Sequence, residues 1–471
     1  MLWACLRFPE LAVEVFERSN VASTPLIVVE QGSRPSVVAA NRTAMQQGIC
    51  IGMTVGAALA LVSHATIKVR NPALETDALK GIAIWAEQFA PLRSLANPAA
   101  VLIEIGGCLS YFGGLRVLLK RMRDGIDELG YRAVMTVAPT ATGTLLFNRA
   151  GFETTITDSR RAREALCKVP IQALDYSRRT IDALEAIGVK SIGDCRDLPR
   201  DGVARRYGQA LLDMIDRAMG DIPDPQKPFV SPETYSGKLM LPAPIWDVDA
   251  LLFGVKRLTH EMCGWLAGRY HGVAAMRLDL LHEDVPPTYF PLNLSTPTRT
   301  AKDLILLWRE RLSQQKLPDR VVGIGLLTIE TVPLDSQSLS LLKEKGSNGD
   351  DIDLLDRLRA RLGDDAVSLL HTYADHRPES AWKQGAIQAS VEPLPPAPRP
   401  IWFLTQPTAL KSVGNEGWIL LDGPERIEAG WWDGAPVCRD YYVARNPQGQ
   451  TVWVFRDWRQ HGQWFLQGLF A

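Results

Sequence analysis

The feature that most constrains the fold is an alternation of short apolar segments with amphipathic ones across residues 1–165. PLIVVE, AVLIEIGG and RAVMTVAP are apolar runs typical of buried strands, and LRVLLKRMRDGIDELG has the spacing of a helix with one apolar face. The chain opens with such a run, WACLR, which passes through Pro9 into the helical pattern LAVEVF. Strands that alternate with helices in this way predict an α/β sheet domain.

The pattern changes after this region. Residues 166–232 contain helical patterns only, including the helix, glycine turn and helix of LEAIGVKSIG. Residues 236–334 again mix strands and helices and predict a smaller α+β domain. Residues 335–398 are polar and proline-rich, which is typical of a flexible tether. Residues 399–471 are dense in Trp and Tyr with turn residues between short runs, and they predict a compact, mostly-β module.

Composition narrows the class of protein. The net charge is −1, so any contact with nucleic acid has to come from local basic faces. The seven cysteines are scattered without a Cys-x-x-Cys pair, which argues against a zinc knuckle or a disulfide framework. No stretch reaches the ~20 apolar residues of a membrane span, and the N-terminus lacks a signal-peptide pattern. We expect a cytoplasmic protein that holds no metal and no cofactor and does not contact a membrane.

The order of these segments resembles the Y-family translesion DNA polymerases. The resemblance covers residues 2–332 and is most specific over residues 38–53, within VVAANRTAMQQGICIGM. It implies palm and fingers for the first domain, a helical thumb for the second and a little finger for the third. The predicted fold is therefore an α/β and α+β multidomain chain of Y-family type, with a small mostly-β module added at the C-terminus.

The carboxylates that active members of this family use are missing. The family places Asp-x-Asp on the first strand and Asp-Glu on a later one, where they hold two Mg²⁺ ions. Aligned on AVE, the first two positions are Cys5 and Arg7, and aligned on EIGGCLSYFGG the other two are Gly106 and Gly107. A thiol, a guanidinium group and two glycines cannot replace four carboxylates. The resemblance thus predicts a polymerase fold without an active site.

The positions that grip the incoming nucleotide are changed as well. The family motif carries a Tyr and an Arg that hold the triphosphate, and these positions are Arg42 and Met45 here. The Lys expected after the third strand has no counterpart, because no lysine occurs between Lys120 and Lys168. We therefore expect no nucleotide binding, and we expect Arg42 to be a solvated surface residue.

The C-terminal segment with GPERIEAGWWDG, RDYYVA and VWVFR is similar to the tail of the ImuB proteins, catalytically silent Y-family relatives of bacterial mutagenesis cassettes. The resemblance implies a non-catalytic adaptor in SOS-induced translesion synthesis. It would bind damaged primer–template DNA and the sliding clamp, and recruit a RecA-like ImuA and an error-prone C-family polymerase. Two alternatives stay open: an active polymerase in which Glu14, Glu104 or another acid completes an atypical metal site, and a protein–protein hub that does not bind DNA.

Two segments are candidates for sequence-independent contact with DNA. The LEAIGVKSIG turn offers backbone N–H groups around Gly188 and Gly193 to a phosphate, although a plain turn between two helices has the same pattern. The little-finger segment has a basic edge with Lys302 and Arg309, and a solvated charged face is the alternative. Further cations of that segment are Arg311, Lys316 and Arg320.

Two segments are candidates for protein partners. DSQSLSLLKEKG resembles the bacterial sliding-clamp motif, in which a Gln amide fixes register and leucines enter an apolar pocket. The matching residues are Gln337, Leu339, Leu341 and Leu342. The aromatic residues of the tail predict either an interaction face or the core of a small β module. They are Trp431, Trp432, Tyr441, Tyr442, Trp453 and Trp464.

Overall fold

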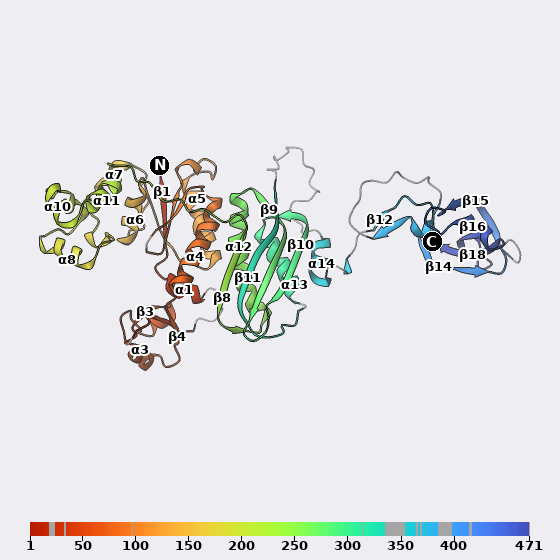
Figure 1. Ribbon diagram of the computed structural model, residues 1–471, viewed down its shortest axis with the longest axis horizontal. Helices are drawn as coiled ribbons and strands as arrows, with labels where there is room; N and C mark the ends of the chain where they lie inside the picture. The colour runs from red at the N-terminus through yellow and green to blue at the C-terminus, as the bar shows by residue number, and fades with distance from the viewer. Residues whose placement is uncertain are drawn as a thin grey trace. The chain divides into compact units, whose positions relative to one another are not determined.

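The computed structural model contains two compact units, Met1–Arg361 and Leu362–Ala471 (Figure 1). The structure describes residues 1–17, 24–32, 34–96, 98–313, 315–334, 354–363, 366–367, 370–384, 398–413 and 417–470. Within these ranges, no helix combines the length and the apolar character that crossing a membrane requires.

The first sheet lies at the N-terminus and has the order β5-β6-β1-β7, with every neighbouring pair antiparallel. The central strand β1 is buried on both faces. Ala4 and Leu6 belong to the core under α4 and α5, whereas Trp3 and Cys5 pack toward α6 on the opposite face. The apolar run at the start of the sequence is thus a strand covered on both sides. The elements are β1 (Trp3–Arg7), α1 (Leu11–Glu17), α4 (Pro72–Trp85), η1 (Ala86–Gln88), β5 (Arg93–Ala96), β6 (Ala100–Glu104), η2 (Gly106–Cys108), α5 (Leu115–Leu129), β7 (Val134–Ala138) and α6 (Ala141–Arg149).

The second sheet is inserted between α1 and α4 and has the order β3-β2-β4. Asn41 and Thr54 cap the two short helices of this insertion with their side chains. Gly48 and Gly52 have φ angles of 93° and 89°, so the break between the two helices falls at the glycines, as the sequence predicts. The elements are β2 (Leu26–Val29), β3 (Val37–Ala40), α2 (Arg42–Gln46), α3 (Val55–Leu61) and β4 (Thr66–Val69).

The segment that follows α6 is helical and has its own apolar core. It also contacts the first sheet domain, because the Thr140 hydroxyl before α6 donates to the Ala218 carbonyl of α11 at 2.7 Å. The elements are α7 (Ser159–Leu166), η3 (Ile171–Ala173), α8 (Arg178–Ala186), α9 (Ile192–Arg196), α10 (Arg200–Tyr207) and α11 (Gln209–Met219).

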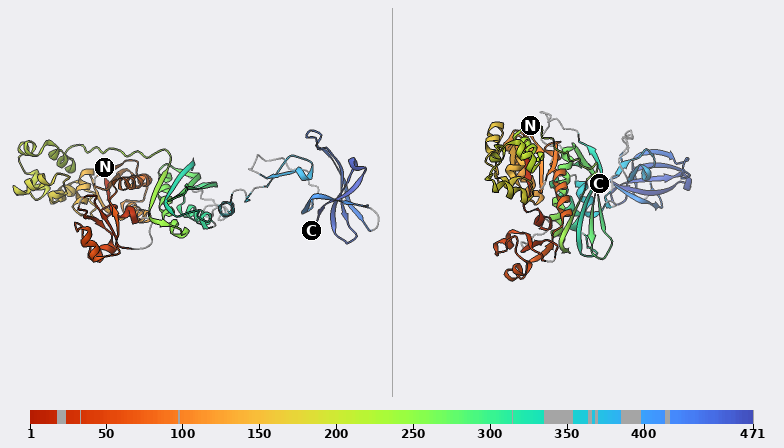
Figure 2. Two further views of the ribbon diagram at one scale, coloured as in Figure 1. Left: turned by 60° about the horizontal axis from the view of Figure 1, so that its bottom comes forward. Right: turned by 60° about the vertical axis from the view of Figure 1, so that its left-hand side comes forward.

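The third sheet has the order β10-β9-β11-β8, and α12 and α13 cover one of its faces (Figures 1 and 2). Helix α12 also packs against α4 and α5 of the first sheet domain. Helix α14 returns to this domain: Asp356 accepts the Ser295 N–H, and Ala360 is buried in the core under the sheet. The helical pattern DLLDRLRARLGDDAV within the predicted tether does form a helix, but this helix packs against the third sheet domain rather than lying free in the tether. The elements are β8 (Ser236–Ile245), α12 (Val248–Gly268), β9 (His271–His282), β10 (Thr288–Thr298), α13 (Ala301–Ser313), β11 (Val321–Pro333) and α14 (Leu354–Leu362).

The second unit is a mostly-β structure with a five-stranded antiparallel sheet in the order β14-β18-β17-β16-β15. A short hairpin, β12–β13, is joined to this sheet by Arg377, which bonds Asp433 before β16. The compact part thus begins ahead of the predicted boundary at 399. The predicted class, mixed α/β with a separate mostly-β C-terminal part, is confirmed. The elements are β12 (Leu370–Thr372), η5 (Pro378–Ser380), β13 (Trp382–Gln384), β14 (Trp402–Leu410), β15 (Ile419–Ala429), β16 (Val437–Arg445), β17 (Thr451–Asp457), η6 (Trp458–Gln460) and β18 (Gln463–Leu469).

Candidate functional site

Cys5 lies in the middle of β1 and has no exposed surface. It packs with Leu102 of β6 and Ala141 of α6, so helix α6 covers the face of the strand on which the thiol lies. Burial raises the pKa of the Cys5 thiol to about 12, although Arg7 and Arg149 act in the opposite direction. A buried, protonated thiol offers no anionic oxygen to a hard cation.

Arg7 ends the same strand and is tied to the last turn of α6. Its Nε donates to the side-chain Oδ1 of Asn148 at 2.7 Å, and its Nη2 donates to the Asn148 carbonyl at 3.3 Å. Asn148 in turn donates to the carbonyls of Val134 at 2.8 Å and of Cys5 at 3.4 Å. A guanidinium group at the C-terminal end of a helix is stabilising, whereas a Mg²⁺ ion beside it would be repelled. The strand end is therefore a structural contact between β1 and α6.

Gly106 and Gly107 do not lie beside Cys5 and Arg7, so the predicted alignment of these glycines is wrong. Strands β1 and β6 are antiparallel, with Trp3 opposite Glu104, and the Ile105 N–H donates to the Leu2 carbonyl at 2.8 Å. The glycines thus follow the end of β6 that lies at the start of β1. With ~3.3 Å of rise per residue, Leu2 and Arg7 are about 16 Å apart, far beyond the ~4 Å that separates two catalytic metals.

The turn between β5 and β6 is the segment that does lie beside Arg7. Ala100 is paired with both Ala96 and Arg7, and the Phe8 N–H donates to the Ala99 carbonyl at 2.9 Å. The sequence of this turn, LANPAA, contains no Asp or Glu. A second pair of carboxylates is thus absent beside Arg7 as well, because the turn between β5 and β6, rather than Gly106 and Gly107, lies there and contains no acid.

The two acids named as replacement ligands are engaged elsewhere. Glu104 Oε1 accepts the N–H groups of Leu2 and Gly106, both at 3.1 Å. Glu14 is 5% exposed and accepts the Arg132 N–H at 2.8 Å, and burial raises the pKa of its carboxyl group to about 7. Among the residues that the structure describes, no three His, Cys, Asp or Glu side chains come together as a metal site. The described residues therefore do not fit the pair of Mg²⁺ ions that the family resemblance implies.

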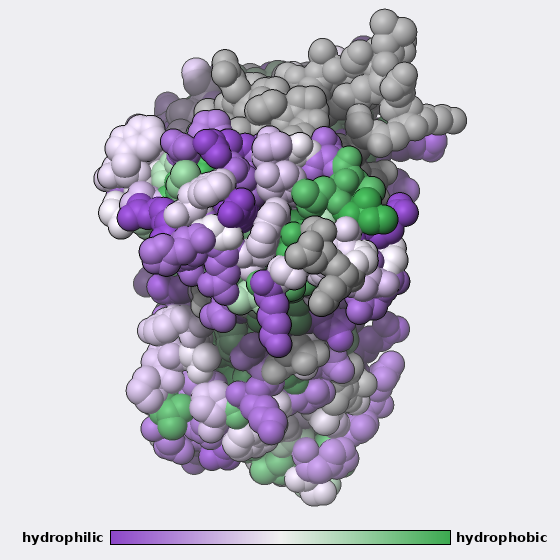
Figure 3. Space-filling model, turned by 90° about the vertical axis from the view of Figure 1, so that its right-hand side faces the viewer, coloured by the Kyte–Doolittle hydropathy of each residue, from purple (hydrophilic) through white to green (hydrophobic). Residues whose placement is uncertain are grey.

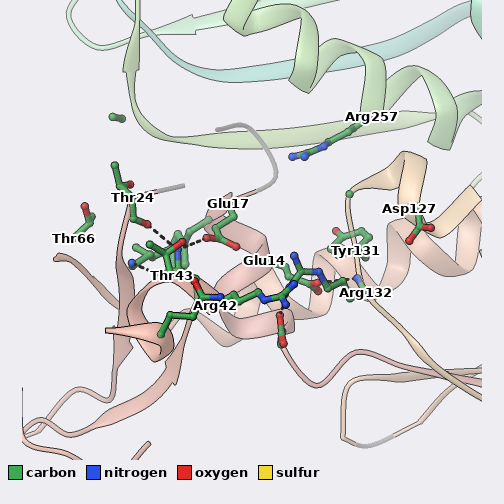
Figure 4. Close-up of a pocket in the computed structure, with 17 residues that line it drawn as sticks. Glu14, Glu17, Thr24, Arg42, Thr43, Thr66, Asp127, Tyr131, Arg132 and Arg257 are labelled. Carbon is green, nitrogen blue, oxygen red and sulfur yellow. Dashed lines mark hydrogen bonds and ion pairs between the residues drawn. The ribbon is translucent and has the colours of Figure 1, made fainter. Parts of the chain in front are cut away.

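Arg42 and Met45 begin and continue α2, and both are exposed. Arg42 lines a cavity of about 670 Å³ together with Arg132 and Arg257. Figure 4 shows the side chains of Arg42 and Arg132 reaching into the same space. Four acids line this cavity too, so it does not have the excess of positive charge that a triphosphate requires. They are Glu10, Glu14, Glu17 and Asp127.

The backbone of the LEAIGVKSIG turn does not offer the predicted phosphate site, because its N–H groups already have acceptors. Gly188 donates to the Glu185 carbonyl at 2.9 Å, and Gly193 donates to the Cys167 carbonyl at 3.0 Å. The N–H groups of Lys190 and Ser191 both donate to Asp194 Oδ2 at 2.9 Å, and these bonds lower the pKa of the Asp194 carboxyl group. The Asp194 carboxylate therefore accepts the backbone N–H groups that a bound phosphate would otherwise accept.

Lys302 and Arg309 lie on α13, seven positions apart, which is nearly two turns of helix. They therefore share one face of α13, and both are exposed. No ion pair of either one occurs among the described residues, whereas Arg320 is paired with Glu283 at 3.0 Å. Lys302 and Arg309 thus form an exposed basic pair on α13, whereas the charge of Arg320 is offset by Glu283.

The residues proposed for protein partners divide into two groups. The clamp motif, Gln337 to Leu342, lies outside the described residues. In the tail, Tyr441 and Trp453 are buried and stack at 4.2 Å between ring centroids, so they belong to the core of the sheet. Trp431 and Trp432 are instead 75% and 56% exposed.

Comparisons with known proteins agree with the resemblance that the sequence motifs indicate. Residues 10–145 match the impB/mucB/samB family model. The chain is 24% identical over 472 residues to Protein ImuB of Caulobacter vibrioides, found alike in two strains, which covers 90% of this chain and 100% of the relative.

Solved structures with a similar course of the chain include an insertion ternary complex of Dbh DNA polymerase, with 16% identity and a TM-score of 0.42 over 71% of this chain and 100% of that one. DinB from Sulfolobus solfataricus is 15% identical, with a TM-score of 0.39 over 70% of this chain and 98% of that one. The full-length match to Protein ImuB and the family model over residues 10–145 together confirm that this chain is a relative of the ImuB proteins.

Proposed function

We propose that the chain is a non-catalytic adaptor in SOS-induced translesion DNA synthesis and mutagenesis. It binds damaged primer–template DNA without regard to sequence, binds the sliding clamp, and recruits an error-prone C-family polymerase and a RecA-like ImuA protein. It works in the cytoplasm, at the nucleoid when bound to DNA. The similarity to Protein ImuB over the full length of that relative supports this role.

The observation that carries the non-catalytic part is the contact between β1 and α6. Cys5 is fully buried beneath α6, and Arg7 is hydrogen-bonded to Asn148. Two-metal phosphoryl transfer needs carboxylates exposed to ions and substrate on this strand. The packed face leaves neither the ligands nor the space for them.

The alternative, an active polymerase with an atypical metal site, requires Glu14 or Glu104 as a ligand. Both carboxyl groups accept backbone N–H groups, and Glu104 lies at the start of β1 rather than at its end. The observed geometry therefore disfavours this alternative.

A primer-extension assay with Mg²⁺ or Mn²⁺ tests the proposal. We expect no template-directed addition of nucleotides by the purified full-length chain. Glu104→Gln and Glu14→Gln serve as matched variants, because activity that is present in the wild type and lost in either variant would establish the alternative.

A salt titration of binding to primer–template DNA separates the adaptor from a hub that does not bind DNA. Contacts with phosphates release counterions, so the affinity of an adaptor falls steeply as salt rises and depends little on sequence. A chain without measurable affinity at low salt would support the hub instead.

A further inference from the structure

Two tryptophans of the second unit are exposed side by side. Trp431 and Trp432 occupy the turn between β15 and β16, with 75% and 56% of their surface exposed. Their ring centroids are 4.7 Å apart at an interplanar angle of 82°. The face of the molecule drawn in Figure 3 is largely hydrophilic, with hydrophobic side chains gathered in a few patches. Adjacent exposed indole rings are large apolar surfaces of the kind that marks a binding site.

The turn that carries these rings is held by a buried guanidinium group. Arg377, with 9% of its side chain exposed, donates to the carboxylates of Asp375 and Asp433 and to the Ala435 carbonyl. Asp433 also accepts the Ala435 N–H at 3.1 Å, and the Arg377 guanidinium lies 5.8 Å from the centre of the Trp432 ring. The part of the turn that follows the two tryptophans is therefore fixed to the β12–β13 hairpin segment.

The backbone of the turn is fixed in the same way. Gly430 has a φ of 85°, and a Cβ atom there would overlap the Ala435 carbonyl oxygen. Only glycine fits this position. A binding surface that is already ordered loses little conformational entropy on association, so each contact contributes more of its energy to affinity.

The exposed pair is separate from the core of the unit. Tyr441, Trp453 and Phe455 fill the core of the sheet, and the Tyr441 ring contacts both of the other rings. Trp431 makes its ring contact with Trp432. Removing the Trp431 indole therefore leaves the packing of the sheet unchanged.

The charges at the base of the turn select the class of partner. The two carboxylates of Asp375 and Asp433 face Arg377, and Arg459 donates to the Pro436 carbonyl at 3.1 Å. These four charges balance. Nucleic acid and anionic membranes require an excess of positive charge, whereas two protruding indole rings fit an apolar pocket of another protein, where Trp is among the residues that contribute most to affinity.

We propose that the Trp431–Trp432 turn is the anchor by which the second unit docks into an apolar pocket of a partner protein. This inference rests on the proposed function, because the proteins that the adaptor recruits are the partners to be probed. The proposed function does not say which residues contact the recruited proteins, and this inference names them.

The test measures binding of the purified full-length chain to two separately purified probes, the C-family polymerase and the RecA-like ImuA protein. Trp431→Ala with Trp432→Ala should weaken binding of at least one probe about 30-fold or more, the range of a strong interface residue. Trp431→Ala alone should weaken it too, and this variant keeps the Arg377–Trp432 contact and thus the turn. Trp402→Ala is the matched control, since it removes a 67% exposed indole of β14 in the same unit.

Each outcome decides between the hypotheses. Equal binding by the wild type and both tryptophan variants would overturn this inference alone. A wild-type chain that binds neither probe would overturn the recruitment hypothesis together with it. Loss of binding to a single-stranded dT oligonucleotide in the variants, with unchanged protein binding, would assign the turn to nucleic acid instead. A loss that Trp402→Ala shares to the same extent would mean that indole rings contribute without regard to position, and it would overturn the specific anchor.

Discussion

Replacing Glu14 by Gln should stabilise the protein at neutral and alkaline pH and leave it unchanged in mild acid. Burial raises the pKa of the Glu14 carboxyl group from its ordinary value of 4.5 to about 7. Between these values the folded state binds a proton that the unfolded state has released, so stability falls as pH rises from about 4.5 to about 7. Above pH ~7 the full penalty remains, at ~1.4 kcal/mol for each pKa unit, or roughly 3 kcal/mol.

The Gln side chain has the shape of the protonated acid and retains an oxygen for the Arg132 N–H, which Glu14 Oε1 accepts at 2.8 Å. Because it carries no charge, this penalty disappears. The advantage of Glu14→Gln over the wild type should thus be near zero at pH 4, about 1 kcal/mol at pH 5 and about 3 kcal/mol at pH 8. Urea unfolding of the full chain at a series of pH values measures it, followed by a probe of the first unit.

Glu30→Gln is the control, because Glu30 is exposed. Its substitution should leave the pH dependence as in the wild type. Parallel stability curves for Glu14→Gln and the wild type between pH 5 and 8 would refute the reasoning, since they would mean that the carboxyl group is ionised in the folded state at no cost.

The other predictions concern function. The double variant Cys5→Asp with Arg7→Asp should show no primer extension with Mg²⁺, and its unfolding midpoint should be lower. The reason is that it buries a carboxylate beneath α6 and removes the contact with Asn148. Primer extension by this variant would contradict the inference that α6 closes this face of β1. Lys302→Glu with Arg309→Glu should weaken DNA binding and reduce its salt slope, measured by fluorescence anisotropy, and unchanged binding would place the contact elsewhere. Deletion of residues 337–342 should abolish binding to the sliding clamp, whereas the C-family polymerase and the ImuA-like protein should still bind. Unchanged affinity of the deletion variant for the clamp would show that this segment is not the clamp-binding motif.

The elements with strong local patterns were predictable from the sequence. The run WACLR forms β1 and LAVEVF forms most of α1, with Pro9 between them. The glycine break within residues 43–62 also lies where the pattern puts it. In these segments, apolar spacing and glycine or proline chemistry act within a few residues, so no long-range information is needed.

The alignment of Gly106 and Gly107 was wrong because it depended on pairing between distant strands. Strand β5, with the sequence RSLA, is short and half polar, so its sequence lacks a recognisable strand pattern. Without β5 there is no β5–β6 hairpin, and the segment beside Arg7 cannot be located. Register in a sheet is set by tertiary pairing, which a single sequence does not display.

The predicted phosphate site at Gly188 and Gly193 is not supported by the structure, and part of the reason could have been read from the sequence. Ser191 and Asp194 form a capping box, and this S-x-x-D spacing is visible in SIGD. It indicates that the start of α9 already has its own carboxylate. The bond from Gly193 to the Cys167 carbonyl was not visible, because its partners are distant in the chain.

The contact between β1 and α6 fits the proposed role of a polymerase-like fold that does not catalyse phosphoryl transfer. A set of carboxylates close together is costly to fold, since like charges repel and need metal or solvent around them. Cys5 instead packs as a small apolar residue under α6, and Arg7 satisfies Asn148 at the end of that helix. Both side chains belong to a contact between β1 and α6 that stabilises the first sheet. If the chain is the non-catalytic adaptor that we propose, the fold serves as a platform for binding. Two carboxylates introduced at Cys5 and Arg7 would have to break this contact before any metal could enter.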